Sequence, residues 1–205
     1  MKISALSRDL NIQEKPLLIE IHTCKSIVAV AEAFVNVKKS VTSTIGNKDH
    51  KSLTSSSHIL LNDLSIFFNT LIEQILFTKL SWPSNRLEPI SIVRYCQGEE
   101  YKPHHDDYAP IYYYYKKYAE TNKLTTAGNR VSTALIYLND NFLGGETKFP
   151  KIAKSIKPVT GKLVTWNNID NCGIRIEEAL HCGAIVTSGI KYIVSAHLRE
   201  KSFYM

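Results

Sequence analysis

Four consecutive residues, His104, His105, Asp106 and Asp107, bring together side chains that are well suited to hold a metal ion. Two imidazoles and one carboxylate form the facial triad that binds non-haem Fe(II) in oxygenases. If this segment is an extended strand, residues two apart share a face. The candidate pairs are then His104 with Asp106 and His105 with Asp107, and strand periodicity does not choose between them. The third ligand must be a histidine from elsewhere in the chain.

The first part of the chain is predicted to supply helices that support this segment. Residues 24–39 carry apolar side chains at helical spacing, and residues 62–80 form a broad apolar face. We expect Asn62 or Asp63 to cap the second helix, and the pair Trp82-Pro83 to end it.

The flanking segments of the first part are predicted to be less regular. Residues 15–22 form a short apolar run that predicts a strand, and residues 41–57 have the composition of a loop.

From residue 90 the sequence changes to short β-like runs separated by Gly, Asn and Pro. Many short strands at near-regular spacing are typical of a sandwich or barrel. We therefore expect an α+β protein with one domain over residues 1–205, in which residues 1–88 are mainly helical support and residues 89–200 form the β core. The predicted strands are 90–95, 103–108, 131–138, 147–149, 162–166, 184–186 and 192–198.

Composition is that of an ordinary globular protein, with 25 basic and 19 acidic residues and a net charge of +6. The lysines are scattered, so the charge alone is weak support for a nucleic-acid partner. The four cysteines have no metal-site spacing and are expected to be free thiols. Neither a signal peptide nor a bilayer-spanning run is apparent, so we expect a cytoplasmic protein with no membrane partner.

The segment from Ala109 to Asn129 follows the candidate metal strand and is rich in tyrosine, beginning with Tyr112 and Tyr113. Long connections inside compact domains are usually functional loops or disordered segments. Two interpretations stay open: a mobile flap over the substrate, or a surface segment packed on the sheet or on a neighbouring molecule.

Four blocks in this order resemble the prolyl 4-hydroxylase family of Fe(II)- and 2-oxoglutarate-dependent dioxygenases, over residues 90 to 199. The blocks are VRYCQGEEYKPHHDDY, NRVSTALIYLNDNFLGGETKFP, KPVTGKLVTWNN and ALHCGAIVTSGIKY. The resemblance implies a double-stranded β-helix, a jelly-roll barrel whose strands surround the metal.

The family pattern Tyr-x-x-His-x-Asp implies that His104 and Asp106 are the first two ligands of Fe(II). The third ligand implied by the resemblance is His181. Without the resemblance, each other histidine competes for that place, and the competitors are His22, His50, His58 and His197.

The resemblance implies that Lys191 holds the distal carboxylate of 2-oxoglutarate, with hydroxyl contacts from Tyr95 and Thr133. A dianionic cosubstrate needs a fixed cation, and a buried lysine persists only when it is paired. If residues 191–197 form an unbroken strand, His197 faces the same side as Lys191. The family often has tryptophan at this position. His197 then has three interpretations: contact with the cosubstrate, contact with the substrate, or filling of core space. We favour a position behind the groups that contact the cosubstrate or substrate.

The implied reaction is hydroxylation of a prolyl residue in a protein or peptide, with release of succinate and carbon dioxide and with ascorbate as a possible reductant. Arg130 aligns with an arginine near the family's substrate groove, although a salt-bridged arginine is the simpler interpretation. Alternative substrates are a free amino acid, another small molecule or another side chain. Nucleic-acid demethylation ranks lower because those enzymes typically use arginine where this chain has Lys191. A non-catalytic binding module is disfavoured because every expected ligand is present.

Overall fold

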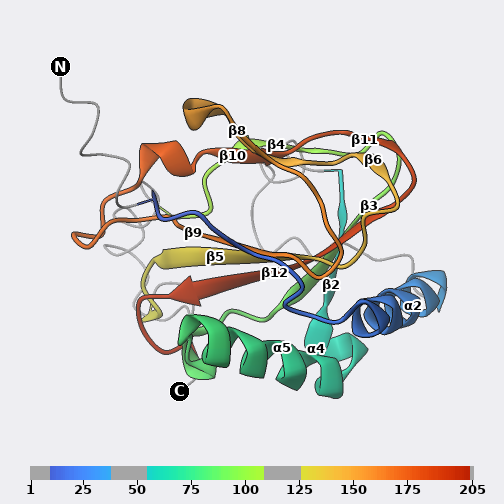
Figure 1. The fold of residues 1–205 in the computed structure, drawn as a ribbon. Helices are drawn as coiled ribbons and strands as arrows, with labels where there is room; N and C mark the ends of the chain where they lie inside the picture. The colour runs from blue at the N-terminus through green and yellow to red at the C-terminus, as the bar shows by residue number, and fades with distance from the viewer. Residues whose placement is uncertain (1–9, 38–54, 109–125, 204–205) are drawn as a thin grey trace.

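The structure, a computed structural model, describes residues 10–37, 55–108 and 126–203. Its largest element is a six-stranded antiparallel sheet that runs through the middle of the molecule (Figure 1). In order across the sheet, the strands are β1 (Gln13–Lys15), β9 (Leu163–Asn167), β5 (Arg130–Tyr137), β12 (Lys191–Arg199), β3 (Ser91–Tyr95) and β2 (Ser57–Leu60).

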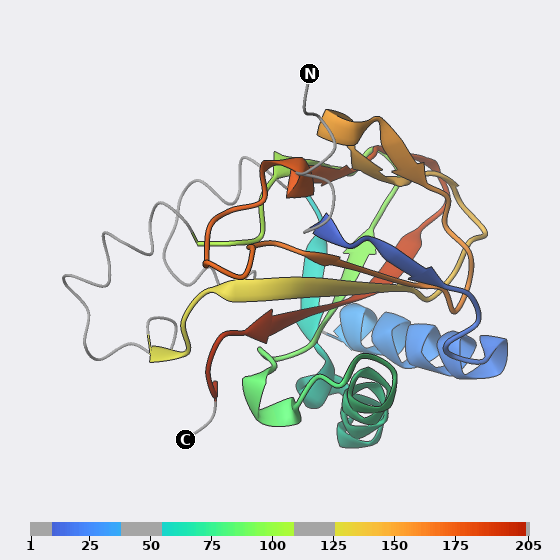
Figure 2. The same cartoon turned by 60° about the vertical axis from the view of Figure 1, so that its left-hand side comes forward.

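A four-stranded antiparallel sheet lies over one face of the large sheet, and the helices lie over the other (Figures 1 and 2). Its strands, in order, are β4 (Tyr101–His104), β10 (His181–Gly183), β7 (Thr147–Phe149) and β8 (Lys154–Ile156). A two-stranded sheet pairs β6 (Leu143–Gly144) with β11 (Val186–Ser188), and the 3-10 helices are η1 (Ser84–Arg86), η2 (Pro150–Ile152) and η3 (Glu177–Ala179). These layers confirm the predicted α+β class and the jelly-roll arrangement.

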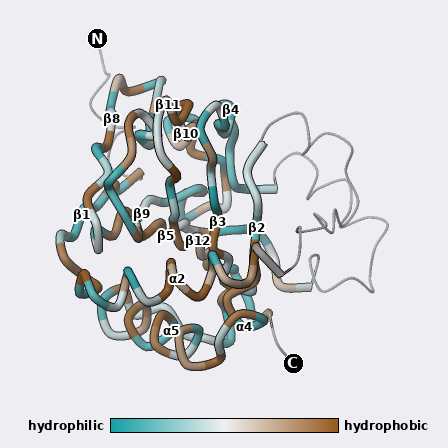
Figure 3. Tube along the Cα trace, turned by 90° about the vertical axis from the view of Figure 1, so that its right-hand side faces the viewer, coloured by the Kyte–Doolittle hydropathy of each residue, from teal (hydrophilic) through white to brown (hydrophobic). Residues whose placement is uncertain are grey.

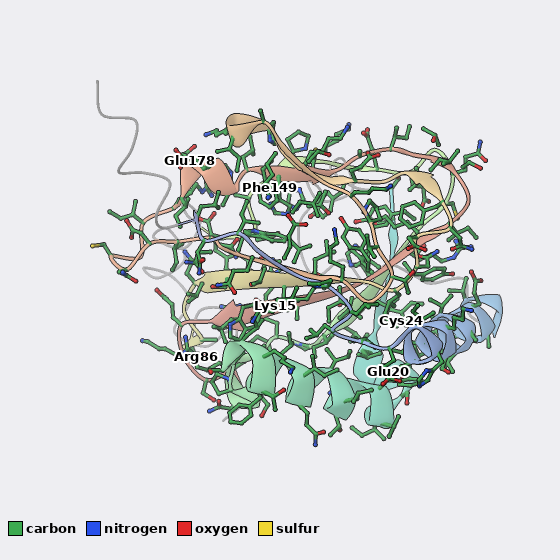
Figure 4. All side chains as sticks on the ribbon, in the orientation of Figure 1. Lys15, Glu20, Cys24, Arg86, Phe149 and Glu178 are labelled. Carbon is green, nitrogen blue, oxygen red and sulfur yellow. The ribbon has the colours of Figure 1, made fainter. Side chains whose placement is uncertain are left out.

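Three helices, α2 (Ile21–Val37), α4 (Leu61–Leu64) and α5 (Ile66–Leu80), cover the other face of the large sheet. Figure 3 shows hydrophobic residues along α5 and along the central strands. The helix-side core lies between these helices and strands. Figure 4 places Cys24 of α2 on this helix side and Phe149 on the side of the small sheet. The predicted helix over residues 24–39 is therefore confirmed, beginning three residues earlier than expected.

Strand β5 is buried on both faces because it lies between the helices and the small sheet. Ile136 packs in the helix-side core with Ile72. The alternate residues Leu135 and Tyr137 pack between the two sheets with Trp166. A strand covered on both sides reads as a nearly continuous apolar run, which is how the second half of β5, residues 134–137, reads in the sequence.

The N-terminal part of the chain contributes strands to the large sheet as well as the helices that cover it. Strands β1 and β2 form its two edges, with β1 paired to β9 and β2 paired to β3. The large sheet therefore contains strands from both predicted parts of the chain, residues 1–88 and residues 89–200.

The strand predicted over residues 15–22 is wrong. The strand there is β1, which ends at Lys15, and the next residues form a turn in which Leu17 has a positive φ of 49°. Pro16 has no N–H to donate to a ladder, which explains why pairing stops at this point. The apolar run instead places Ile19 in the helix-side core, with a relative exposure of 3%.

The helix predicted over residues 62–80 is two helices, because the chain is extended at Ser65, with φ −165°. The Ser65 hydroxyl accepts a hydrogen bond from the Phe68 N–H at 3.4 Å and caps α5. The prediction that Asn62 or Asp63 provides the cap is therefore wrong. Helix α5 ends at Leu80, before Trp82-Pro83 as expected.

Two predicted strands near the site are displaced. Strand β4 ends at His104, so Asp106 lies in the bend that follows the strand rather than within it. The run predicted over residues 184–186 overlaps an observed strand only at Val186, the first residue of β11, and its other two residues lie between β10 and β11. The remaining predicted strands of the β core match observed ones to within two residues at each end.

Candidate metal and dicarboxylate site

Three side chains converge between the two sheets. One ligand atom each from His104, Asp106 and His181 lies within 4.8 Å of the other two. His104 Nε2 is 3.5 Å from Asp106 Oδ1, and His181 Nε2 is 3.6 Å from Asp106 Oδ2. Pairing of β4 with β10 sets His104 opposite His181 and brings two parts of the sequence 77 residues apart into contact. Two imidazoles and one carboxylate are the donor set of a non-haem Fe(II) site.

Both imidazole rings are fixed from behind by backbone carbonyls. His104 donates a hydrogen bond from Nδ1 to the Lys102 carbonyl at 2.7 Å, and His181 donates from Nδ1 to the Ala179 carbonyl at 2.9 Å. With the proton on Nδ1, the lone pair of Nε2 points towards Asp106. The hydrogen bond behind each ring thus sets the tautomer that a metal ligand needs.

The charge states of the cluster also suit a cation. Burial alone would raise the pKa of Asp106, but His181, His197 and His104 bring that pKa well below its ordinary value. Burial lowers the pKa of His181 to about 4, with Asp106 opposing the change. At neutral pH the carboxylate is therefore ionised and the His181 imidazole is neutral, which are the forms that bind a metal.

A chain of hydrogen bonds holds Asp106 from the large sheet. Thr133 donates from its hydroxyl to Asp106 Oδ2 at 2.6 Å, and Asn168 donates from Nδ2 to the same hydroxyl at 2.9 Å. His197 Nδ1 lies 3.2 Å from the Thr133 hydroxyl and 3.9 Å from Asp106 Oδ2. His197 therefore lies on the inner face beside the site, on the side that strand periodicity predicted.

The other two polar residues of the HHDD run face away from the cluster. Asp107 has a fully buried side chain that pairs with Arg175, at 2.9 and 3.1 Å from Arg175 Nε to the two carboxylate oxygens. His105 donates from Nε2 to the Glu177 carbonyl at 3.2 Å. Of the two pairs that the sequence left open, the structure brings His104 and Asp106 together with His181.

Lys191 lies deep between the sheets, with a relative exposure of 1%. Its Nζ donates to the Gly145 carbonyl at 2.8 Å and lies 4.8 Å from the centre of the Tyr95 ring. Burial lowers the pKa of Lys191 to about 8, with Glu146 and Cys182 opposing the change. Within residues 10–37, 55–108 and 126–203, no carboxylate forms a salt bridge with this ammonium group, so its position suits an added anion.

Strand β10 connects the metal cluster to the surroundings of Lys191, because it carries both His181 and Gly183. A side chain built at Gly183 would begin 3.6 Å from Lys191 Nζ. Gly183 follows His181 by two residues on β10, which is about 7 Å along an extended strand. The absence of a side chain at Gly183 keeps this space open.

Hydroxyl groups near Lys191 were missed in the sequence. Tyr137, whose ring centre is 5.7 Å from Lys191 Nζ, shares a 2.7 Å hydrogen bond between its hydroxyl and that of Thr147. The signal that could have found Tyr137 is strand pairing: Tyr137 lies opposite Ile193, on the side that Lys191 faces. That inference requires knowing that β5 is the neighbour of β12.

Thr133 and Tyr95, predicted together as cosubstrate contacts, lie at different ends of β12. Tyr95 pairs with Lys191, whereas Thr133 pairs with His197, six residues or about 20 Å further along the strand. The Thr133 hydroxyl is engaged by Asp106, Asn168 and His197.

Arg130 is held in a buried charge cluster at the entrance of β5. Its Nε and Nη2 donate to the two carboxylate oxygens of Glu88 at 2.8 and 2.7 Å, and Arg199 donates to Glu88 at 2.7 Å. Arg130 is therefore salt-bridged, which is the simpler of the two interpretations offered by the sequence. Tyr112 and Tyr113, and with them the predicted flap, lie outside the described residues.

Comparison with known proteins agrees with this donor set. Residues 90–199 match the family described as the 2OG-Fe(II) oxygenase superfamily. A putative prolyl 4-hydroxylase of Acanthamoeba polyphaga mimivirus is 29% identical over 157 residues, covering 75% of this chain and 61% of that protein. Prolyl 4-hydroxylase 1 of Arabidopsis thaliana is 29% identical over 194 residues, covering 87% and 65%. The chain thus spans a little over three fifths of the length of these two relatives.

Solved structures support the fold. A viral collagen prolyl hydroxylase from Paramecium bursaria Chlorella virus-1, in its 2OG complex, superposes with a TM-score of 0.62 at 18% identity, covering 95% of this chain and 98% of that one. A Trichoplax adhaerens prolyl hydroxylase, bound to a hypoxia inducible factor peptide fragment, gives 0.62 at 10% identity, covering 92% and 83%.

Proposed function

Because this chain belongs to the 2OG-Fe(II) oxygenase superfamily, we propose that His104, Asp106 and His181 bind Fe(II) in a dioxygenase of the prolyl 4-hydroxylase type. The carrying observation is the convergence of these three side chains within 4.8 Å. Three protein ligands leave positions on the metal open for chemistry, whereas a closed structural site fills them all.

Lys191 is the group proposed to bind the distal carboxylate of 2-oxoglutarate. It is a buried cation beside Gly183, and so two strand residues from His181. That spacing suits a five-carbon dicarboxylate with its keto acid end at the metal. The Tyr95 and Tyr137 ring centres lie 4.8 and 5.7 Å from Lys191 Nζ, and the Tyr137 and Thr147 hydroxyls, which share a 2.7 Å hydrogen bond, are proposed as further donors to the carboxylate.

When bound, Fe(II) and 2-oxoglutarate would supply the oxidative chemistry, giving succinate, carbon dioxide and a hydroxylated product. The chain's own residues hold and orient these groups. Phe149 and Trp166 pack around His181, with ring centres 5.8 and 4.7 Å from the imidazole, and exclude water from that side. Thr133 is proposed to fix the Asp106 carboxylate rather than to contact the cosubstrate, because its hydroxyl already lies 2.6 Å from Asp106 Oδ2.

The proposed substrate is a prolyl residue in a protein or peptide. Support comes from the relatives, which are named as prolyl 4-hydroxylases, and from the Trichoplax enzyme, which holds a peptide fragment. None of the described helices combines the length and hydrophobicity needed to cross a bilayer. Contacts of Arg130, Tyr112 and Tyr113 with substrate, the use of ascorbate, and a cytoplasmic location stay predictions from the sequence.

The test is incubation of the purified protein with Fe(II), 2-oxoglutarate and proline-containing peptides, with succinate assayed and mass spectrometry used to detect added oxygen. We expect a gain of one oxygen on proline that depends on 2-oxoglutarate and is absent in Asp106→Ala. If oxygen is added to another residue or to free amino acids, the proposed dioxygenase chemistry stands and the prolyl substrate is wrong. Absence of metal binding in the wild type would remove the proposal altogether.

A further inference from the structure

The two residues of the HHDD run that face away from the cluster bind a single short segment. Asp107 pairs with Arg175, and His105 donates to the Glu177 carbonyl. This segment, residues 175–177, lies just before His181 in the chain. The four residues thus alternate in direction: His104 and Asp106 face His181, while His105 and Asp107 face the chain that leads to it.

The contact between Asp107 and Arg175 is built as a buried connection. The Asp107 side chain is fully buried and the Arg175 side chain is 26% exposed. Arg175 Nε approaches both carboxylate oxygens, and Arg175 is itself held by a β-bridge to Ile169. A buried carboxylate that lost this partner would be strongly unfavourable, so the pair fixes the bend after β4 against the chain before η3.

The His181 backbone follows from that segment with little freedom. Helix η3 spans Glu177–Ala179, and His181 Nδ1 donates to the Ala179 carbonyl. Any shift of residues 175–177 relative to the bend at 105–107 would therefore move His181 relative to Asp106.

We propose that Asp107 and Arg175 are positioning residues for the metal site, joining the two ligand-bearing segments behind the cluster. The inference rests on the proposed function, in that the three residues are taken as metal ligands. Asp107 and Arg175 do not contact the ion themselves. They hold the bend that carries Asp106 against the chain that leads to His181, whereas the β4–β10 ladder sets His104 opposite His181. His105 is a weaker second connection.

The experiment is a Co(II) titration of the metal-free protein, followed by the visible ligand-field spectrum and the dissociation constant. Outer-shell partners of metal ligands typically contribute 10- to 100-fold in affinity. Because this pair acts through the backbone, we expect Asp107→Asn to weaken Co(II) binding by about 10-fold, the low end of that range, and to change the spectrum. Arg175→Gln should act in the same direction and Arg175→Lys less. The double variant should lose less affinity than the sum of the two single losses, because both substitutions remove the interaction that the two residues share.

A matched control is Glu32→Gln, which breaks the partly buried Glu32–Arg94 pair, with N···O at 3.7 Å. That pair connects α2 to β3 and no ligand segment, so its loss should lower thermal stability and leave Co(II) affinity unchanged. If Asp107→Asn does not fold, the more exposed Arg175 variants decide the question. Wild-type affinity and spectrum in the folded Asp107 or Arg175 variants would overturn the proposal. Failure of the wild type to bind Co(II) would instead refute the metal site itself.

Discussion

Thr133 Oγ1 lies 2.6 Å from Asp106 Oδ2 and donates a hydrogen bond to it. Thr133 lies on β5 of the large sheet, whereas Asp106 lies in the bend that follows β4 of the small sheet. Asn168 and His197 also contact the Thr133 hydroxyl. One hydroxyl therefore ties the only carboxylate of the described metal cluster to the large sheet.

Replacement of Thr133 by valine, which is nearly isosteric, should weaken metal binding. The Asp106 oxygen would lose a charge-assisted hydrogen bond and gain rotational freedom. We expect about a 10-fold loss of Co(II) affinity in Thr133→Val and near wild-type affinity in Thr133→Ser. Equal affinities in the two variants, measured by the same titration, would show that the hydroxyl does not position the carboxylate.

Single substitutions in the HHDD run should separate its two faces. His104→Ala, Asp106→Ala and His181→Ala should each abolish succinate formation, because each removes a proposed metal ligand. His105→Ala should retain much of the activity, since His105 faces away from the cluster and donates from Nε2 to the Glu177 carbonyl at 3.2 Å. Succinate release in the presence of Fe(II) and 2-oxoglutarate is the measurement, and equal loss at His105 would contradict the assignment of the ligands.

Lys191→Ala should raise the 2-oxoglutarate requirement steeply. The variant would lose the one buried cation beside Gly183 in the described part of the site, and with it a charge-assisted bond to the distal carboxylate. We expect the KM for 2-oxoglutarate to rise by about 10- to 100-fold, which corresponds to about 1.5–3 kcal/mol. Circular dichroism provides the control for folding. A KM that did not change would place the lysine outside the cosubstrate site.

The same lysine predicts a pH dependence of cosubstrate binding. Burial lowers the pKa of Lys191 to about 8 from 10.5. Below pH 8 the lysine is charged and ready for an anion, whereas above pH 8 binding must take up a proton. The affinity for 2-oxoglutarate should therefore fall as pH rises above about 8, by at most 10-fold per unit. Lys191→Arg should flatten this fall because arginine stays protonated. Calorimetry with Mn(II) in place of iron can measure the affinity for 2-oxoglutarate in the wild type and in Lys191→Arg at each pH.

Much of the site was predictable from local patterns. Strand periodicity put His197 on the Lys191 side, and the four family blocks placed His104, Asp106 and His181. The identity of the residues that support the site was not predictable, because it depends on pairing between distant segments. Asp107 and Arg175 are 68 residues apart and Thr133 is 27 residues from Asp106. Neither separation leaves a periodic signal.

The errors in the fold have local causes that compete with hydrophobic pattern. Ser65 sits inside an apolar helical stripe, yet its hydroxyl caps α5 and breaks the helix. Serine side chains compete with the backbone for hydrogen bonds, which favours caps over helix interiors. The apolar run after Pro16 predicts a strand because its length fits one. In the structure this run is a turn, and Ile19 packs from it into the helix-side core.

Glu88→Gln should destabilise the folded protein in a pH-dependent way. Burial alone would raise the pKa of Glu88, but Arg130, His197 and Arg199 bring it well below the ordinary value. Its side chain is 10% exposed and forms ion pairs with both arginines. Removing one partner of a buried pair typically costs about 3–5 kcal/mol, so we expect a loss of that order in the free energy of unfolding at pH 7.

The sign of the pH effect follows from the lowered pKa of Glu88. The folded state keeps this carboxylate ionised at a pH where the unfolded chain binds a proton, so its contribution is complete above about pH 4.5 and decreases as pH falls further. Urea unfolding at pH 7 and pH 3.5 should therefore show a smaller difference between wild type and Glu88→Gln at the lower pH. Glu20→Gln is the control, because Glu20 and His22 form an exposed pair, with 77% and 78% of their side chains accessible. It should change stability by less than about 1 kcal/mol. A Glu88→Gln variant as stable as this control would show that the cluster of Glu88, Arg130 and Arg199 does not stabilise the fold.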